Sequence, residues 1–335
     1  MGRIIALVSG KGGVGKTTVT ACLGVALSQQ GHRVLMTDGD FGLRDLDLVV
    51  GKQNEVIFDV ADVCGDRELA NDAIIPIHKN LDLLPASQAL RWEDVGRNKY
   101  RKLIKKLADE YDYVLVDAPA GIGRGADAIL DFAHRILIVT QPLWVSLRNA
   151  GRVIQVCREK RQFDYAIVFN AMQQIQVDTD METMMRTLGA EYIGTVLPYA
   201  ENVIHYTQEG QLHTLQDDNF MPMLKPLISY IESGHTWEDH EILQAYESHK
   251  QPGASSIALF EELVEHIEKA TMKEAEESIM EDPVVETEKV ELDNIELEPL
   301  EPEETEVVTF TEENPVHRNT QLLMRQRQSK WRRRR

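Results

Sequence analysis

Residues 4–18, IIALVSGKGGVGKTT, decide the fold of this chain. An apolar run is followed by a loop that fits the phosphate-binding pattern G-x-x-x-x-G-K-[ST]. Its glycines let backbone N–H groups face phosphates, and the positive end of a following helix strengthens the attraction. The stretch therefore predicts a strand, a nucleotide loop and a helix. The expected nucleotide contacts are Gly10, Gly12, Gly13, Val14, Gly15, Lys16, Thr17 and Thr18.

Two lysines lie in this loop, where phosphate binding needs one. Lys16 is placed to reach the β- and γ-phosphates, and Thr17 to bring its hydroxyl to Mg²⁺. Lys11 lies on the outer arm of the loop, too early to share that role within one subunit. It is either a solvated surface lysine or a residue that reaches a nucleotide held by a second copy of the chain.

Short β-branched runs alternate with helix-like stretches through the first 200 residues, and the runs are nearly all apolar. This alternation predicts a doubly wound α/β fold, a mostly parallel sheet with helices on both faces. The expected strands are 4–9, 33–37, 81–85, 113–117, 135–140, 165–170 and 192–197. The expected helices are 17–30, 99–111, 145–160, 180–188, 221–232, 239–248 and 255–270.

Three acidic residues lie at or just after the ends of expected strands, and so should lie at the carboxyl edge of the sheet beside the loop. Asp38 and Asp40 are candidates for holding a Mg²⁺-bound water and for orienting the attacking water. Asp117 ends the apolar run VLVD, and its carboxylate should hold Mg²⁺ through water. These residues predict an ATPase that uses Mg²⁺.

Charge divides the chain into unequal parts. The net charge is −19, but residues 271–314 contain 17 acids and 2 lysines, whereas residues 315–335 contain 8 basic residues and no acid. We expect an ATPase domain at 1–270, an acidic disordered linker at 271–314 and a basic tail at 315–335. The three cysteines are far apart in sequence, which favours neither a disulfide framework nor a metal site.

The sequence resembles the MinD/ParA family of deviant Walker A ATPases, the MinD branch in particular. The resemblance rests on KGGVGKTT, TDGDFGLRDLDLVVG at 37–51, LPASQ at 84–88, DYVLVDAPAGIGRGA at 112–126 and GTVLPYAENV at 194–203. It implies that Lys11 contacts the ATP of the partner subunit in a sandwich dimer. It also implies that Asp40 lies near the attacking water and Asp38 in the outer shell of the metal.

The same resemblance implies contacts of Asn170 and Pro198 with adenine, and two switch segments at 40–47 and 119–121. Three features depart from the MinD pattern. Residues 148–151 read RNAG where acids are common, and residues 214–252 look like an insertion. The basic tail occupies the place of the family's membrane helix, with poor amphipathicity.

The function expected is a cytoplasmic ATPase switch that associates peripherally with the inner face of the cell membrane. ATP would drive homodimerisation, the paired tails would hold anionic lipid, and the dimer would recruit regulatory partners of the MinC or MinE kind to place the division septum. A FlhG-type regulator of flagella and a ParA/Soj-type DNA segregation ATPase are the alternatives. Residues 1–270 carry a net charge of −12, which disfavours broad contact with nucleic acid. An iron–sulfur carrier would need paired cysteines.

Overall fold

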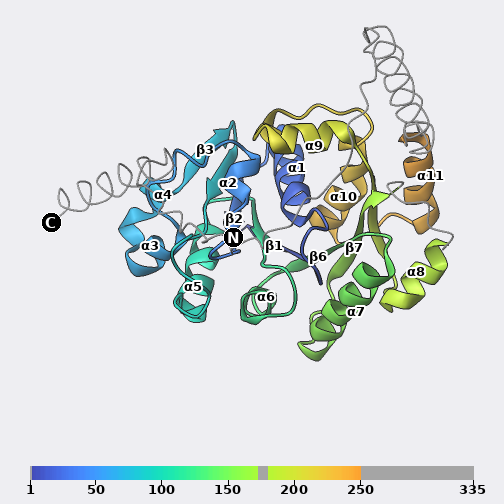
Figure 1. The fold of residues 1–335 in the computed structure, drawn as a ribbon, viewed down its shortest axis with the longest axis horizontal. Helices are drawn as coiled ribbons and strands as arrows, with labels where there is room; N and C mark the ends of the chain where they lie inside the picture. The colour runs from blue at the N-terminus through green and yellow to red at the C-terminus, as the bar shows by residue number, and fades with distance from the viewer. Residues whose placement is uncertain (1, 173–179, 250–335) are drawn as a thin grey trace, which may run out of the picture. The chain divides into compact units, whose positions relative to one another are not determined.

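The computed structural model describes residues 2–172 and 180–249. Within these residues one sheet of eight strands has the order β3-β4-β2-β5-β1-β6-β7-β8. All neighbouring pairs are parallel except β3 and β4, which are antiparallel. The doubly wound α/β class predicted from the sequence is confirmed (Figure 1).

The strands alternate with helices along most of the chain. The strands are β1 (Arg3–Val8), β2 (Val34–Asp38), β3 (Ile75–His78), β4 (Leu81–Leu84), β5 (Tyr113–Asp117), β6 (Arg135–Thr140), β7 (Tyr165–Met172) and β8 (Ile193–Pro198). The longer helices are α1 (Lys16–Gln29), α5 (Arg97–Leu107), α6 (Arg124–Leu130), α7 (Trp144–Glu159), α8 (Met181–Leu188), α9 (Glu201–Gln208), α10 (Lys225–Ser233) and α11 (Asp239–His249). Shorter helices are α2 (Leu46–Val49), α3 (Val60–Gly65), η1 (Arg67–Leu69), α4 (Ala70–Ala73), η2 (Leu212–Thr214) and η3 (Met221–Leu224).

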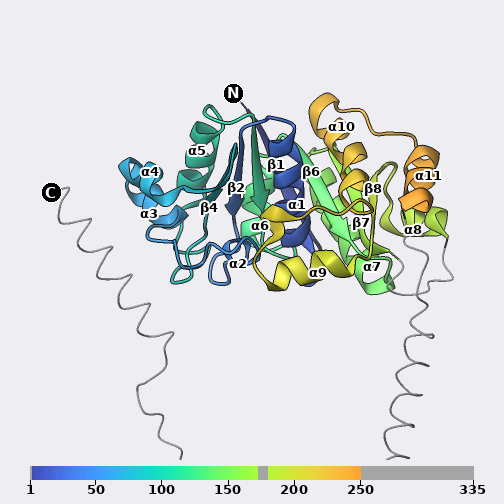
Figure 2. The same ribbon diagram turned by 90° about the horizontal axis from the view of Figure 1, so that it is seen from above.

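The strand order explains why helices cover both faces of the sheet. From β1 the chain moves past β5 to β2, whereas from β5 it moves past β1 to β6 and then to β7. Because parallel crossovers are right-handed, opposite directions of travel place their helices on opposite faces. Figures 1 and 2 show α1 and α10 on one face, with α5, α6 and α7 on the other. The direction reverses at β1, and ligands bind at such switch points beside the carboxyl ends of the strands.

Every residue of β2 and β5 is buried, and in β6 only the first residue is partly exposed, as expected for strands covered on both sides. Each of the seven strands expected from the sequence is present within two residues of its predicted bounds. The edge strand β3 was not predicted, because Pro76 interrupts its apolar run. Proline lacks an N–H for the ladder, so it is compatible with an edge strand but weakens the sequence signal.

The expected helix at 221–232 is wrong in one respect. The structure has a 3₁₀ turn, η3, followed by α10. Pro226 lies in the first turn of α10, where its missing N–H costs little, so the α-helix begins there rather than four residues earlier.

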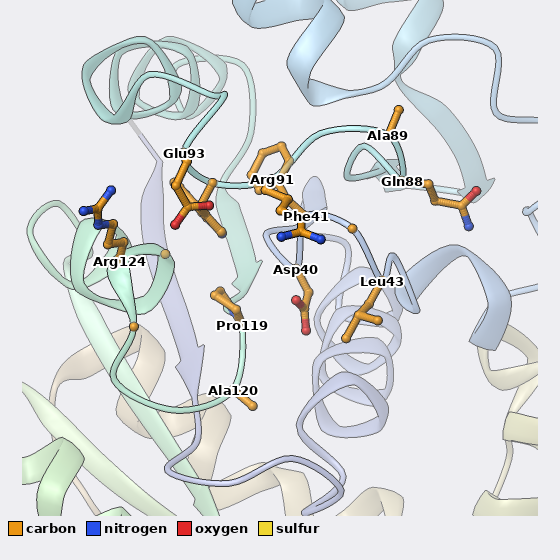
Figure 3. A pocket seen from close by; sticks show the side chains of 14 residues that line it. Asp40, Phe41, Leu43, Gln88, Ala89, Arg91, Glu93, Pro119, Ala120 and Arg124 are labelled. Atoms are coloured by element: carbon orange, nitrogen blue, oxygen red, sulfur yellow. The ribbon is translucent and has the colours of Figure 1, made fainter.

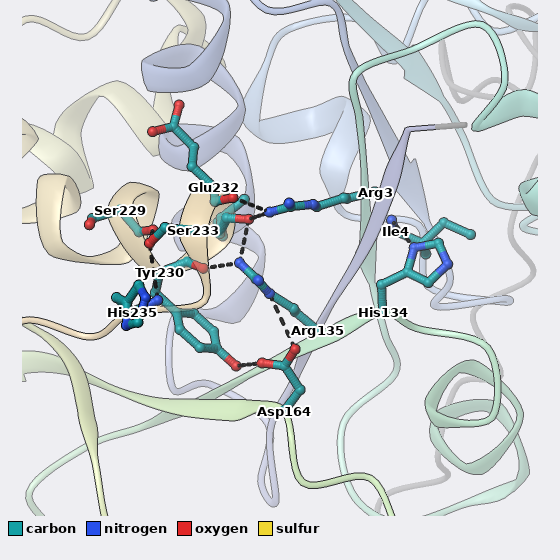
Figure 4. A network of polar contacts seen from close by, with 11 residues as sticks. Arg3, Ile4, His134, Arg135, Asp164, Ser229, Tyr230, Glu232, Ser233 and His235 are labelled. Carbon is teal, nitrogen blue, oxygen red and sulfur yellow. Dashed lines mark hydrogen bonds and ion pairs between the residues drawn. The ribbon is translucent and has the colours of Figure 1, made fainter.

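Within the expected insertion at 214–252, α10 is tied to the amino edge of the sheet. Arg3 of β1 and Arg135 of β6 donate to backbone carbonyls at Tyr230–Glu232, at the end of α10 (Figure 4). Arg135 also pairs with Asp164 at 3.3 Å and lies over the ring of Tyr230. Cations favour the negative end of a helix, so these arginines hold α10 against the sheet. These contacts hold α10 against the sheet, and the predicted domain boundaries stay a prediction. Whether it is an insertion stays a prediction.

Several expectations lie outside the described residues. These are the helix at 255–270, the acidic linker at 271–314 and the basic tail at 315–335. Among residues 2–172 and 180–249, no helix combines the length and apolar character needed to cross a membrane.

Candidate active site

The loop between β1 and α1 has the geometry of a phosphate cradle. Gly13 and Gly15 have φ values of 78° and 85°, which favour glycine over residues with a side chain. Gly15 is the N-cap of α1 and offers no side chain to its N–H groups, which leaves them for a ligand. A Cβ atom on Gly15 would lie 2.2 Å from the side-chain nitrogen of Asn170, so the loop is also closely packed.

Asp117 gathers three side chains of α1 at the carboxyl end of β5. Its Oδ1 lies 2.8 Å from Lys16 Nζ, and its Oδ2 accepts a 2.7 Å hydrogen bond from the Thr17 hydroxyl. The hydroxyl of Thr20 is 2.9 Å from Oδ1. Lys16 and Asp117 are almost fully buried, so the ammonium and the carboxylate compensate each other in a site with little water.

Thr20 was not among the residues singled out from the sequence. It lies one helical turn after Lys16, on the same face of α1, and this i, i+4 spacing was the available signal.

Asp38 is the register partner of Asp117 on the adjacent strand β2, so the two carboxylates lie side by side. Its Oδ1 accepts from Asp40 N at 2.8 Å and its Oδ2 from Leu46 N at 3.0 Å. Burial and the neighbouring charge of Asp117 raise the pKa of Asp38 to about 7. Asp38 therefore fixes the backbone of residues 40–46 in addition to facing the site.

Asp40, two residues after Asp38, is only half-buried. Partial burial raises the pKa of its carboxyl, an effect that the positive charge of Lys16 opposes. A carboxylate with a raised pKa is a better proton acceptor near neutral pH.

Asp40 lines a cavity of about 580 Å³, and its wall residue Ala120 lies near the phosphate loop, with its Cβ 4.0 Å from where a Cβ on Gly12 would be. Three segments form its walls: residues 40–43, residues 88–93, and residues 119–125 at the start of α6. Figure 3 shows Asp40 between the Pro119–Ala120 segment and Leu43. The cavity thus lies between the two segments expected to act as switches.

The two expected switch segments are anchored at their ends and exposed between them. In the first, Arg44 Nε lies 2.9 Å from the buried Asp47, while Leu43 is 64% exposed. In the second, Gly121 N donates to Ser9 O at 2.8 Å, so residues 119–121 run beside the start of the phosphate loop. Ala120 within this segment is exposed, and Ile122, directly after the segment, is 46% exposed.

Lys11 is separate from this cluster. Its side chain is exposed and, within the part of the chain that the structure describes, forms no hydrogen bond or ion pair. Gly10 packs against the backbone of Asn149 in α7, so the outer arm of the loop runs beside that helix. Trp144 and Val145, at the start of α7, are 56% and 60% exposed.

Asn170 and Pro198 lie at the carboxyl ends of the adjacent strands β7 and β8. The Asn170 Nδ2 group donates to Val14 O at 2.8 Å, so this residue holds the phosphate loop. Pro198 is buried and pairs with Met172. Their contact with adenine stays a prediction.

The donor set suits magnesium. Asp117, Asp38 and Thr17 offer only oxygen atoms, the ligands that Mg²⁺ prefers. Among the described residues no cluster of three or more His, Cys, Asp or Glu side chains could hold a metal by itself. A Mg²⁺ ion here would need oxygens from phosphates and water as well, which is usual for nucleotide enzymes.

Sequence comparisons give a consistent set of relatives. The AAA domain model AAA_31 matches residues 2–167. The septum site-determining protein MinD of Synechocystis sp. is 34% identical over 230 residues, which cover 67% of this chain and 86% of that protein. MinD of Thermotoga maritima is 36% identical over 218 residues, covering 63% of this chain and 80% of its own.

Solved structures give the same result. A chain of the MinC:MinD cell division protein complex of Aquifex aeolicus superimposes with a TM-score of 0.61 at 31% identity, over 70% of this chain and 98% of that one. MinD of Pyrococcus horikoshii complexed with Mg-ADP gives 0.57 at 32% identity, over 69% and 94%. A ParA family ATPase of Chlorobium tepidum gives 0.60 at 25% identity, over 70% and 100%.

Proposed function

Because the chain belongs to the MinD/ParA family of P-loop ATPases, we propose that it is an ATP-driven dimerisation switch that helps to place the site of cell division. The observation that carries the proposal is the arrangement of the two loop lysines. Lys16 is buried against Asp117 inside the site, whereas Lys11 is exposed outside it. One lysine serves the subunit's own nucleotide, and the other remains for a second subunit.

Within one subunit, the loop backbone and the amino end of α1 bind the phosphates of ATP. Lys16 exchanges its contact with Asp117 for the β- and γ-phosphates. Thr17 and Asp117, with Asp38 farther out, hold Mg²⁺, which neutralises charge on the phosphates. This is consistent with the Mg-ADP bound by MinD of Pyrococcus horikoshii.

Hydrolysis needs a water in line with the γ-phosphate and a group that orients it. Asp40 borders the cavity beside the loop, and the raised pKa of its carboxyl suits a proton acceptor. Residues 40–47 and 119–121 flank that cavity, so a change at the γ-phosphate reaches both segments.

Dimerisation would complete the site. Lys11 has no competing partner among the described residues, and the exposed Trp144 and Val145 on the neighbouring helix supply apolar surface for a second copy. In the dimer Lys11 adds positive charge to the nucleotide across the interface. That charge is useful only in the ATP state, because it compensates the γ-phosphate.

Membrane attachment is proposed for the basic tail. Each of its 8 basic residues contributes roughly 1 kcal/mol near an anionic leaflet, and a dimer presents two tails. The chain would then cycle between the cytoplasm and the inner face of the membrane. A regulatory partner comparable to MinC is supported by the MinC:MinD complex among the structural neighbours.

Cosedimentation of the full chain tests this proposal. We expect binding to phosphatidylglycerol vesicles with a non-hydrolysable ATP analogue but not with ADP. Replacing Arg332, Arg333, Arg334 and Arg335 by Gln should weaken the binding. Lys11→Ala should bind ATP yet lose dimerisation and vesicle binding, whereas Lys106→Ala, which removes an exposed lysine of α5, should lose neither. ATP-dependent binding to plasmid DNA without binding to vesicles would contradict the proposal and favour the DNA segregation alternative.

The position of a fluorescent fusion in dividing cells distinguishes septum placement from the remaining alternative, regulation of flagella. Accumulation that defines the division site supports septum placement. Accumulation at flagellar poles alone, with normal division in the deletion strain, would assign the chain to flagellar regulation instead.

A further inference from the structure

Trp92 contacts both of the other segments that line the cavity beside Asp40, residues 40–43 and residues 119–125. Its Nε1–H donates a 2.7 Å hydrogen bond to the carbonyl of Gly39, the residue before Asp40. Its ring also packs against Gly125 in α6, where a Cβ atom would lie only 2.3 Å from Nε1. One side chain therefore contacts the peptide that leads into residues 40–47 and the helix that follows residues 119–121.

The indole is held firmly in this position. Phe41 and Tyr100 meet it edge to face, with ring centroids 4.9 Å and 5.1 Å away. Tyr100 is fully buried on α5, so it serves as a fixed support. A turn at 91–95, closed by backbone hydrogen bonds to Arg91 O, presents Trp92 to the cavity. Edge-to-face pairs of this kind stabilise a defined ring orientation.

Gly39 links Trp92 to strand β5, which ends at Asp117. Its N–H donates to Asp117 O at 2.8 Å, while its carbonyl accepts from Trp92. A Cβ atom on Gly39 would lie 3.0 Å from Asp117 O and 3.1 Å from Ile129 Cδ1, so the peptide has little free space. A shift of the indole must therefore displace Gly39, and with it Asp40.

We propose that Trp92 is a positioning residue that couples residues 40–47 to residues 119–125, so that both respond together to the γ-phosphate. The inference rests on the proposed ATPase function of the same site. Close packing transmits displacement between segments because packed side chains have few alternative arrangements. Trp92 is only partly buried and lines the cavity, a position that a residue serving the core alone does not require.

The test compares Trp92→Phe with Trp237→Phe in the full chain. Phenylalanine keeps an aromatic ring but removes the donor to Gly39. Trp237→Phe is the control, because it makes the same substitution at another partly buried tryptophan, just before α11. Two quantities are measured. The first is steady-state ATP hydrolysis. The second is amide hydrogen exchange of residues 40–47 and 119–125, with ADP and with a non-hydrolysable ATP analogue.

We expect Trp92→Phe to lower kcat by roughly two- to tenfold, the effect of one hydrogen bond, with KM changed by less than about twofold. Exchange in both segments should slow together in the wild type when the analogue replaces ADP. In Trp92→Phe only one segment should respond. Trp237→Phe should match the wild type in both measurements, and thermal unfolding checks that both variants fold.

Unchanged kcat and joint protection of the two segments in Trp92→Phe would overturn the coupling and leave the proposed ATPase function intact. Failure of the wild-type chain to hydrolyse ATP would instead contradict the proposed function. The exchange measurement needs no hydrolysis. Independent responses of the two segments in the wild type would therefore overturn the coupling by themselves.

Discussion

The hydroxyl of Thr20 lies 2.9 Å from Asp117 Oδ1, on the side of the carboxylate that also contacts Lys16. Asp117 thus contacts three side chains from two turns of α1, and all three come from the helix that begins at the phosphate loop. Strand β5, whose acid we propose to hold Mg²⁺, and helix α1, which we propose to bind the phosphates, are joined through this one carboxylate. Its orientation is therefore fixed before any ligand arrives.

Thr20→Val should weaken the response of the enzyme to magnesium. Valine has nearly the same shape, but without the hydroxyl Asp117 has one contact fewer, so its orientation for the metal is less fixed. We expect the Mg²⁺ concentration for half-maximal ATPase activity to rise roughly two- to tenfold, the effect of one hydrogen bond to a charged group. A magnesium titration at saturating ATP measures it.

Thr207→Val is the matched control for this prediction. The hydroxyl of Thr207 lies 2.6 Å from the carbonyl oxygen four residues earlier in α9, as the hydroxyl of Thr20 lies 3.0 Å from Lys16 O in α1, but Thr207 lacks the contact with Asp117. Its magnesium response should equal that of the wild type. An equal rise in the half-maximal Mg²⁺ concentration in both variants would mean that the effect comes from lower helix stability rather than from the site.

Asp40→Asn should reduce catalysis far more than binding. The amide keeps the shape of the side chain but cannot accept a proton from the attacking water. We expect kcat to fall by about 10²-fold or more, with the affinity for a non-hydrolysable ATP analogue changed by less than about threefold. Glu93→Gln removes a carboxylate from another wall of the same cavity and should leave kcat near the wild-type value. Similar losses in both variants would mean that negative charge in the cavity, rather than Asp40, supports turnover.

Asp38 should make the nucleotide-free chain less stable as pH rises toward neutrality. The pKa of this carboxyl is raised to about 7 in the folded chain, from an ordinary value of 3.8. Between these values the folded state holds a proton that the unfolded state has lost, so the free energy of unfolding falls with increasing pH until about pH 7. Asp38→Asn is neutral throughout and lacks this dependence.

We therefore expect the free energy of unfolding of Asp38→Asn, relative to wild type, to increase between pH 5.5 and 8. The increase should be about 2 kcal/mol, because one pKa unit corresponds to about 1.4 kcal/mol. Urea unfolding at several pH values measures the difference. A difference that does not vary with pH would show that Asp38 is ionised throughout this range in the folded chain.

Much of this site could be predicted from local sequence, because the loop, Lys16 and the acids at strand ends lie in patterns that determine their own geometry. Parallel strands bring their carboxyl ends to one edge, so Asp38 and Asp117 could be expected together. Trp92 belongs to no such pattern. Its partners Gly39 and Gly125 are distant in sequence, and their contacts depend on how two loops pack. Likewise, the hydrogen bond from Asn170 to Val14 joins strand β7 to the loop after β1, which periodicity cannot reveal.

The side-chain amide of Asn170 has a donor group, Nδ2, and an acceptor, Oδ1, to divide between the phosphate loop and the base. Its Nδ2 group donates to Val14 O, which leaves Oδ1 to accept from the exocyclic amine of adenine. Guanine has a carbonyl at that position and would face Oδ1 with a second acceptor. We therefore expect Asn170→Ala to lower kcat/KM for ATP more than for GTP, reducing the preference for ATP by roughly fivefold or more.

Steady-state kinetics with both nucleotides separates this role from that of a loop anchor. Asn202→Ala removes an exposed residue whose amide donates to Asp217, so it controls for loss of an asparagine and should leave the ATP-to-GTP ratio unchanged. Because the bond to Val14 is lost with either nucleotide, weaker loop packing lowers both values of kcat/KM by the same factor. An unchanged ratio in Asn170→Ala would contradict the adenine contact and restrict Asn170 to holding the loop. A reduced ATP-to-GTP ratio of kcat/KM in Asn170→Ala would support a hydrogen bond between Asn170 Oδ1 and the adenine base.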